Sequence, residues 1–256
     1  MVPRKSRPYI GSDFFIGGFM IEEFKKYVSN YDIDNKKVEL KLDHSLRVME
    51  LSKKYSEMLN FSADDKLLAI EIGLLHDVGR FEQIKRYDTF NDLISVDHGL
   101  LGSKILFEEK LIENFSISSE HYEIIRKAIE NHNRYQIEDG LNKRELMHAK
   151  LIRDTDKLDI LYNAAYLDYI DISTEDENVS FEVLEDIKNR RTVNSKNKKN
   201  KNDRIASFFA FAFDINNNAC LEEIKEYIEV IYNRIEYKGK LKEVYNLVIN
   251  YIEERN

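Results

Sequence analysis

An adjacent histidine and aspartate, His76 and Asp77, interrupt an otherwise apolar stretch of the chain, Ile-Gly-Leu-Leu-His-Asp-Val-Gly at residues 72–79. Burying an imidazole beside a carboxylate is unfavourable unless another group binds both, and a divalent cation is the usual one. A hydrogen-bonded pair in the core is the simpler alternative. The pair alone does not distinguish a metal site from a hydrogen-bonded core pair. Other candidate ligands elsewhere in the chain are needed to choose between them.

Further side chains that can bind metals recur at intervals as long as one helix plus a loop. In chain order the set is His44, the His76-Asp77 pair, His98, His132 and an aspartate at 154 or 156. If each comes from its own helix, a helical bundle can bring them to one internal point. Nitrogen and carboxylate ligands without thiolates suit Fe, Mn, Co, Zn or Mg.

The last position in this set is open between two aspartates. Asp154 and Asp156 are two residues apart, so on an α-helix they point about 200° apart and cannot both face one ion. Both have apolar neighbours four residues away, so periodicity leaves the choice open.

We interpret the two remaining histidines as structural. His121 lies near the start of a predicted helix among polar neighbours, where it would cap the helix or lie at the surface. His148 precedes the two aspartates and would support a ligand without binding the metal itself.

The composition favours helices as the elements that position these residues. Only 2 Pro and 9 Gly occur in 256 residues, and these are the residue types that interrupt helices and form turns. A hydrophobic content of 43%, with 14 Phe and 15 Tyr, is enough for a folded core despite the high charge. We therefore predict an all-α protein.

Apolar spacing and capping residues predict the individual helices. Those that would carry or support the candidate ligands cover residues 13–27, 38–59, 64–76, 95–107, 118–133 and 143–171. Residues 81–91 are predicted to be irregular. The other helices are expected at 181–191, 205–213, 221–234 and 241–253, and the last two are amphipathic, so they would close the core or form an interface in a homo-oligomer.

We predict one domain over residues 1–256. Its motif core would cover 38–165, and a C-terminal helical extension would cover 180–256. Within the extension, residues 192–203 are rich in Asn and Lys and are predicted to form a flexible, solvated loop.

Charge and composition exclude several classes of protein. The net charge of −8 argues against a polymeric nucleic acid as partner. The single cysteine, Cys220, rules out an internal disulfide and a cysteine-rich zinc site. No apolar run approaches the roughly 20 residues that span a bilayer, and the basic start of the chain has no apolar segment behind it. We expect a cytoplasmic protein without a membrane partner.

The order and context of these residues resemble the HD superfamily of metal-dependent phosphohydrolases. The matching pieces are His-Ser-Leu-Arg-Val at 44–48, Leu-Leu-His-Asp-Val-Gly-Arg at 74–80 and Asp-Lys-Leu at 156–158. The resemblance implies a helical bundle of the HD-domain type with additional C-terminal helices. It also implies that a first metal is bound by His44, His76, Asp77 and Asp156. The family places the last ligand directly before a Lys or Arg, which selects Asp156 over Asp154.

His98 and His132 extend the resemblance to HD proteins that bind two metals, among them bacterial diadenosine tetraphosphate hydrolases and cyclic dinucleotide phosphodiesterases. In such sites Asp77 would bridge the two ions. The cyclic dinucleotide enzymes have an adjacent His-His pair where this chain has Asn131 and Asn133 on either side of one histidine. The chain also lacks their Gly-Tyr-Pro signature, so that subfamily is disfavoured.

The resemblance implies hydrolysis of a phosphoester or phosphoanhydride of a small phosphorylated molecule, most plausibly a nucleotide, by a metal-activated water. Catalysis would depend on His76 and Asp77. Lys157 and Arg80 would contact substrate phosphate, Lys as a point charge and Arg through paired hydrogen bonds. Two alternatives stay open: a mixed-valent di-iron oxygenase with the same ligands, and a non-catalytic metal-binding module, against which the complete ligand set argues.

Overall fold

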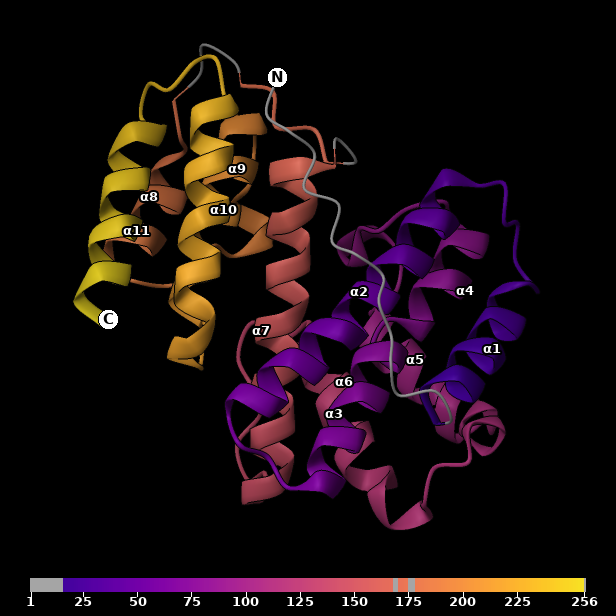
Figure 1. Cartoon of the computed structure of the whole chain (residues 1–256). Coiled ribbons are helices and arrows are strands. Elements are labelled where there is room, and N and C mark those ends of the chain that lie inside the picture. Colours follow the sequence, from indigo (N-terminus) through magenta and orange to yellow (C-terminus); the bar gives the residue numbers. More distant parts are fainter. Residues whose placement is uncertain (1–15, 168–169, 175–177, 256) are drawn as a thin grey trace. The chain divides into compact units, whose positions relative to one another are not determined.

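The computed structural model describes residues 16–167, 170–174 and 178–255. Within these ranges it contains helices and no strand, which confirms the all-α prediction (Figure 1). The residue contacts divide the chain into two compact units, and each is described by itself. The N-terminal unit comprises the described residues up to Asp156, and the C-terminal unit those from Lys157 onward. The single domain over 1–256 stays a prediction.

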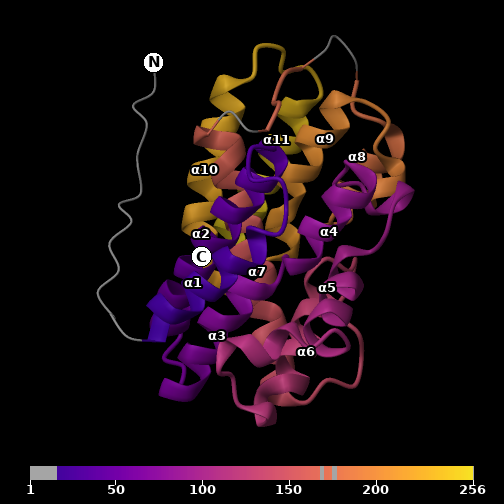
Figure 2. The ribbon, with the colours of Figure 1, turned by 90° about the vertical axis from the view of Figure 1, so that its right-hand side faces the viewer.

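The N-terminal unit is built from α-helices joined by short turns. Its helices are α1 (Ile16–Val28), α2 (Lys36–Met58), α3 (Ala63–Leu75), α4 (Val78–Tyr87), α5 (His98–Phe107), α6 (Tyr122–His132) and the first part of α7 (Lys143–Tyr166). Three short 3-10 turns, Asp92–Ile94, Leu111–Phe115 and Ser119–His121, lie between them. Helix α2 packs along α3, α4 packs on α5, and α5 packs on α6 (Figure 2).

Side-chain caps and apolar burial explain why these segments are helical. Asn35, Ser62 and Asp97 each accept a hydrogen bond from a backbone N–H in the first turn of the helix that follows. Large apolar side chains such as Leu68 and Phe81 are fully buried in one continuous core. Burying a side chain of this size stabilises the fold by about 1.5–3 kcal/mol.

The prediction of an irregular segment at 81–91 is wrong for residues 81–87, which belong to α4. Val78, Phe81 and Ile84 recur on one buried face of this helix. The residue at its N-cap is Asp77, a type that is common at this position, but its carboxylate makes no capping hydrogen bond. The helix is stabilised by its short apolar face rather than by a side-chain cap.

Helices α4 and α5 approach each other closely at a glycine. A Cβ atom on Gly79 would lie 2.2 Å from the backbone oxygen of His98 and 2.6 Å from the nitrogen of Gly102. No other residue fits between the two helices without moving one of them. Gly79 thus allows His98, the first residue of α5, to lie beside Asp77.

The C-terminal unit contains the second part of α7 and the helices α8 (Phe181–Lys188), α9 (Lys201–Phe209), α10 (Leu221–Arg234) and α11 (Leu241–Arg255), with 3-10 turns at Ser195–Asn197, Ala210–Asp214 and Asn218–Cys220. Helix α11 packs against α8, α9 and α10 (Figure 1). In the described part of the chain, no helix has the length and apolar character needed to cross a membrane.

Several predicted boundaries shift. Residues 201–203, predicted as loop, open α9, where Asn200 and Asp203 form a reciprocal capping box and Asp203 is fully buried. The helix predicted at 205–213 is α-helical only to Phe209 and continues as a 3-10 turn. Helix α7 ends at Tyr166, and α5 begins at His98, after its cap Asp97. The predicted start of the first helix at Asp13 lies outside the described residues.

Candidate metal centre

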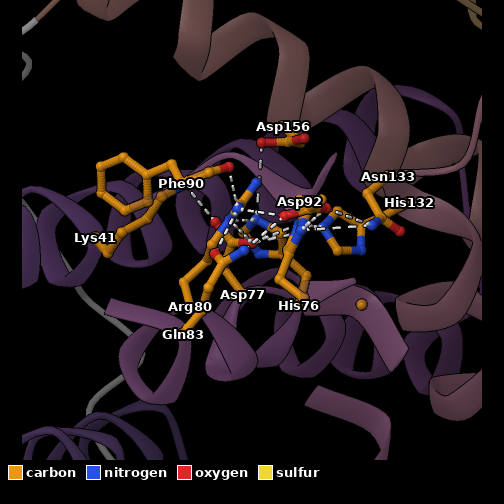
Figure 3. Close-up of polar contacts among 12 residues, drawn as sticks. Lys41, His76, Asp77, Arg80, Gln83, Phe90, Asp92, His132, Asn133 and Asp156 are labelled. Atoms are coloured by element: carbon orange, nitrogen blue, oxygen red, sulfur yellow. Dashed lines mark hydrogen bonds and ion pairs between the residues drawn. The ribbon is translucent and has the colours of Figure 1, made fainter. Parts of the chain in front are cut away.

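Six side chains from six helical elements converge within the N-terminal unit. His44 lies in the middle of α2 and Asp156 in α7, while the other four stand at helix ends: His76 ends α3, Asp77 precedes α4, His98 begins α5 and His132 ends α6. All six are buried except the Asp156 carboxylate, whose side chain is 15% exposed. Figure 3 shows Asp156 reaching from α7 toward the groups around Asp77.

The two carboxylate oxygens of Asp77 face different histidine pairs. Oδ2 lies 3.3 Å from His44 Nε2 and 3.6 Å from His76 Nε2. Oδ1 lies 3.3 Å from His98 Nε2 and 3.5 Å from His132 Nε2. Asp156 Oδ1 joins the first group, 3.1 Å from His44 Nε2 and 3.7 Å from His76 Nε2. Asp77 is therefore shared between two groups of ligand-forming atoms.

The second histidine pair has its unprotonated nitrogens facing each other. The Nδ1 of His98 lies 2.6 Å from Asp92 Oδ2, and the Nδ1 of His132 lies 2.6 Å from the Ile129 carbonyl oxygen. Both partners accept hydrogen bonds, so in the neutral rings Nδ1 carries the proton and Nε2 is bare. Yet the two Nε2 atoms are 2.9 Å apart. Two lone pairs at this distance repel each other unless a cation lies against both.

Burial favours the forms of these side chains that bind metals. Burial lowers the pKa of His98 to about 4 and also lowers that of His76, so both rings are neutral at pH 7. Burial alone would raise the pKa of Asp77 and of Asp156. The groups around each carboxylate together outweigh burial, first among them the Lys41 ammonium for Asp77 and hydrogen bonding by His44 for Asp156, so both pKa values lie well below the ordinary range.

One carboxylate oxygen of the centre, Asp77 Oδ1, lacks a hydrogen-bond donor in the described part of the chain, and the nitrogen Nε of Arg80 lies 3.7 Å from it. Among the described residues, none donates a hydrogen bond to Asp77 Oδ1, although this oxygen is fully buried. Neutral imidazoles that present bare nitrogens cannot donate to it. A divalent cation would satisfy the carboxylate oxygen and both nitrogens at once, so the donor set fits such an ion.

The comparison with protein families agrees with this geometry. The family model described as the HD domain matches residues 42–165, a range that includes all six converging side chains. Residues 42–165 are an HD domain. HD domains bind divalent metals and are in general phosphohydrolases. No curated protein and no solved structure matched the chain at a significant level.

A second group of residues in this HD domain fixes the orientation of His98. Asp92, which holds the Nδ1 of His98, accepts hydrogen bonds from Arg80 at 2.9 Å and Gln83 at 2.8 Å. Asn133 donates to the other oxygen of Asp92 at 3.2 Å. A carboxylate that accepts the second N–H of a metal-binding histidine sets the tautomer and orientation of the ring. Asp92 was not predicted, although its place in a polar turn six residues before His98 is a usable signal in the sequence.

The two cations predicted to contact substrate have other partners. Arg80 Nη1 donates to Gln83, to the Phe90 carbonyl oxygen and to Asp92, all within 2.9 Å. Lys157 lies in the C-terminal unit, where its Nζ is 2.7 Å from Asp214 Oδ2. Their contact with phosphate stays a prediction, and the structure gives Arg80 a role in holding Asp92.

A third cation, Lys41, was not predicted. It stands three residues before His44 on α2, and its Nζ lies 2.5 Å from Asp77 Oδ2. The ammonium also lies 5.5 Å from the centre of the Phe90 ring. In Figure 3 it approaches Asp77 from the side away from His132. Only the i, i+3 spacing to His44 could have indicated this position from the sequence.

The remaining histidines and Asp154 lie outside the centre. His121 was predicted to cap a helix or lie at the surface. It is the N-cap residue of α6, but its side chain makes no capping hydrogen bond and is buried, and its Nε2 is 3.2 Å from Asp64 Oδ2. His148 Nε2 is 3.1 Å from Asp65 Oδ1, so it does not support a ligand of the metal centre through this contact. Asp154 is fully buried on α7. It is not among the groups of side chains that could share an ion in the described part of the chain.

Proposed function

We propose that this protein is a metal-dependent phosphohydrolase with a binuclear centre, and that it cleaves a phosphoester or phosphoanhydride of a small molecule. One observation supports it above the others. The two oxygens of Asp77 each face a separate pair of histidines, at 3.3–3.6 Å, as a carboxylate bridging two cations requires. The first ion would be held by His44, His76, Asp77 and Asp156, and the second by Asp77, His98 and His132.

Two divalent cations held this way would lower the pKa of a bound water and would stabilise the negative charge that develops on the phosphoryl oxygens. The chain's own residues maintain the site for this chemistry. Asp92 keeps the bare Nε2 of His98 directed at Asp77 by accepting the proton on Nδ1. The backbone oxygens of Gly73 and Ile129 do the same for His76 and His132, at 2.9 and 2.6 Å.

The substrate class follows from the chemistry and the charge of the chain. With a net charge of −8, the protein is unsuited to wrapping a polymeric nucleic acid, whereas a small anion needs only a local positive charge. Nucleotides, which combine phosphoester and phosphoanhydride bonds, are the first substrates to test.

The experiment is a screen of phosphorylated small molecules, nucleotides included, with Mn²⁺, Fe²⁺, Co²⁺ and Mg²⁺, together with metal analysis of the purified protein. The expected result is phosphate release that depends on the added metal and is absent from a folded His76→Ala/Asp77→Ala variant. Circular dichroism and the melting temperature establish that this variant is folded.

Two results would overturn the proposal. Unchanged phosphate release by the double variant would assign the activity to a contaminant and favour a metal-binding module without catalysis. A mixed-valent di-iron signal in electron paramagnetic resonance, with oxygen consumption and no hydrolysis with Mn²⁺ alone, would favour an oxygenase.

A further inference from the structure

Lys41 forms an ion pair with an oxygen that the metal centre also needs. Its Nζ lies 2.5 Å from Asp77 Oδ2, the same oxygen that faces His44 Nε2 at 3.3 Å. The groups of side chains that could share one ion include His44, His76 and Asp77 together. A divalent cation bound to this group would take the oxygen that Lys41 now holds.

An ammonium and a divalent cation on the same carboxylate oxygen repel each other. Lysine carries its charge on a flexible four-carbon chain, so its ammonium can move away from Asp77 when the cation binds, whereas the Lys41 backbone stays fixed in α2. The Phe90 ring, 5.5 Å away, limits where the ammonium can go. The backbone oxygen of Phe90 is itself held by Arg80 at 2.8 Å.

Lys41 also lies at a partly open edge of the centre. Its side chain is 13% exposed and that of Asp156 is 15% exposed, whereas that of His76 is fully buried. Arg80 and Asp92, with side chains 14% and 28% exposed, border another partly open edge. A substrate that enters beside Asp156 would meet Lys41. Three cationic side chains have been considered as phosphate contacts. Lys157 is paired with Asp214. Arg80 is paired with Asp92 at 2.9 Å and lies 3.7 Å from Asp77 Oδ1, whereas Lys41 contacts Asp77 directly at 2.5 Å.

We propose that Lys41 is a substrate-binding residue. Its ammonium pairs with Asp77 in the structure and would bind a phosphoryl oxygen of the substrate when divalent cations occupy that carboxylate. This inference rests on the proposed binuclear centre. It explains why an ammonium lies within a cation-binding site: an anionic ligand replaces Asp77 as its partner, so the lysine is charge-balanced in both states.

The test measures binding of two ligands without turnover. Isothermal titration calorimetry would follow Mn²⁺ binding to the metal-free protein and inorganic phosphate binding to the Mn²⁺-loaded protein, for wild type, Lys41→Met and Lys41→Arg. Lys37→Met is the matched control, since Lys37 lies one turn earlier on α2 and pairs with the exposed Asp88. We expect Lys41→Met to bind phosphate at least about tenfold more weakly and Mn²⁺ up to about fivefold more tightly. Lys41→Arg should regain most of the phosphate affinity.

Opposite changes in the two affinities distinguish substrate binding from a structural role. Loss of Mn²⁺ together with phosphate in Lys41→Met would overturn the inference, because Lys41 would then only maintain the site. The inference would also be overturned if Lys41→Met bound phosphate within twofold of the wild-type affinity. It would likewise fail if the Mn²⁺-loaded wild-type protein did not bind phosphate. If phosphate binding depends on Lys41 but no phosphoester is hydrolysed, the proposed function fails and this inference stands. If phosphoester hydrolysis occurs and the KM of Lys41→Met equals that of wild type, the proposed function stands and this inference fails.

Discussion

The N-terminal unit contains two clusters of His and Asp residues that differ in how their charges are balanced. In the metal centre, bare imidazole nitrogens face each other and a shared carboxylate. In the second, which we call the paired cluster, His121 pairs with Asp64 and His148 with Asp65, and Arg144 contacts both aspartates. The same residue types thus make a cation site in one place and a network of histidine–aspartate and arginine–aspartate pairs in the other, where the buried Nδ1 of His148 is left without a hydrogen-bond partner. Bare imidazole nitrogens that face each other and a shared carboxylate, rather than residue type, indicate the metal site.

The largest effect that separates the clusters is expected from Asp77→Asn. This change keeps the size of the side chain but removes the charge that faces both histidine pairs, so both ions should be lost and hydrolysis should fall to background. Metal analysis after dialysis and a phosphate-release assay measure it. Asp65→Asn in the paired cluster is the control and should keep the full metal content. Equal loss of metal in both variants would erase the distinction between the two clusters.

Gly79→Ala should be the next most damaging change. The added Cβ would overlap the backbone oxygen of His98, so α5 must shift and carry His98 away from Asp77. Forcing a methyl group into such a contact costs about 1–3 kcal/mol or more. Denaturant unfolding should show this loss, and metal analysis should show weaker binding of one ion. The control is Gly18→Ala, because a Cβ atom on Gly18 would have no other atom within 4 Å. Gly140→Ala is less suitable, because the left-handed backbone of Gly140 would strain any other residue. Wild-type stability in Gly79→Ala would contradict the close approach of the two helices.

A smaller effect is expected from Asp92→Asn. The carboxylate orients His98 but does not itself face Asp77, so its loss should weaken metal affinity by about 10–100-fold without preventing folding. Titration of the metal-free variant with Mn²⁺ measures the change. Because Arg80 and Gln83 also bind Asp92, the same variant should raise the mobility of the Arg80 side chain. Metal affinity within a factor of two of wild type would assign Asp92 to the stability of the turn alone.

The smallest effect concerns the paired cluster and depends on pH. Burial raises the pKa of Asp65, but hydrogen bonds from Ser62, Arg144 and His148 outweigh it and lower the pKa to about 2. A depressed carboxyl pKa stabilises the fold above the ordinary value of 3.8 and loses this effect as the pH falls toward 2. Asp65→Asn should therefore lower the free energy of unfolding by about 1–3 kcal/mol at pH 7. Urea unfolding of both proteins from pH 7 to pH 3 should show the difference shrinking, and a constant difference would contradict it.

Much of the fold could be predicted because helix propensity and apolar spacing act locally. The helix predicted at 221–234 has the observed bounds of α10, and the all-α class followed from the scarcity of Gly and Pro. Helix α4 was missed because its apolar pattern is short and because Asp77, which stands at its N-cap, was interpreted as a metal ligand. Aspartate can cap a helix or bind a metal, so the residue type alone does not mark a helix start.

The candidate site divides in the same way between what the sequence carries and what only the structure shows. The six converging side chains could be named from residue type, spacing and the family resemblance. Asp92 left only a weak local signal, its place in a polar turn six residues before His98. Lys41 could not be named, because it acts through a contact with Asp77, 36 residues away in the sequence. Such contacts depend on packing, as at Gly79, and leave no periodic pattern. The partner of Lys157 likewise follows from the position of Asp214, which the sequence does not reveal.

The central claim is that Asp77 bridges two cations between the two histidine pairs. The most direct measurement is an anomalous difference map from crystals of the protein loaded with Mn²⁺. We predict two peaks, one among His44, His76, Asp156 and Asp77 Oδ2, and one among His98, His132 and Asp77 Oδ1. The absence of any peak beside Asp77, or a peak at the paired cluster of Asp64 and Asp65 instead, would contradict the account.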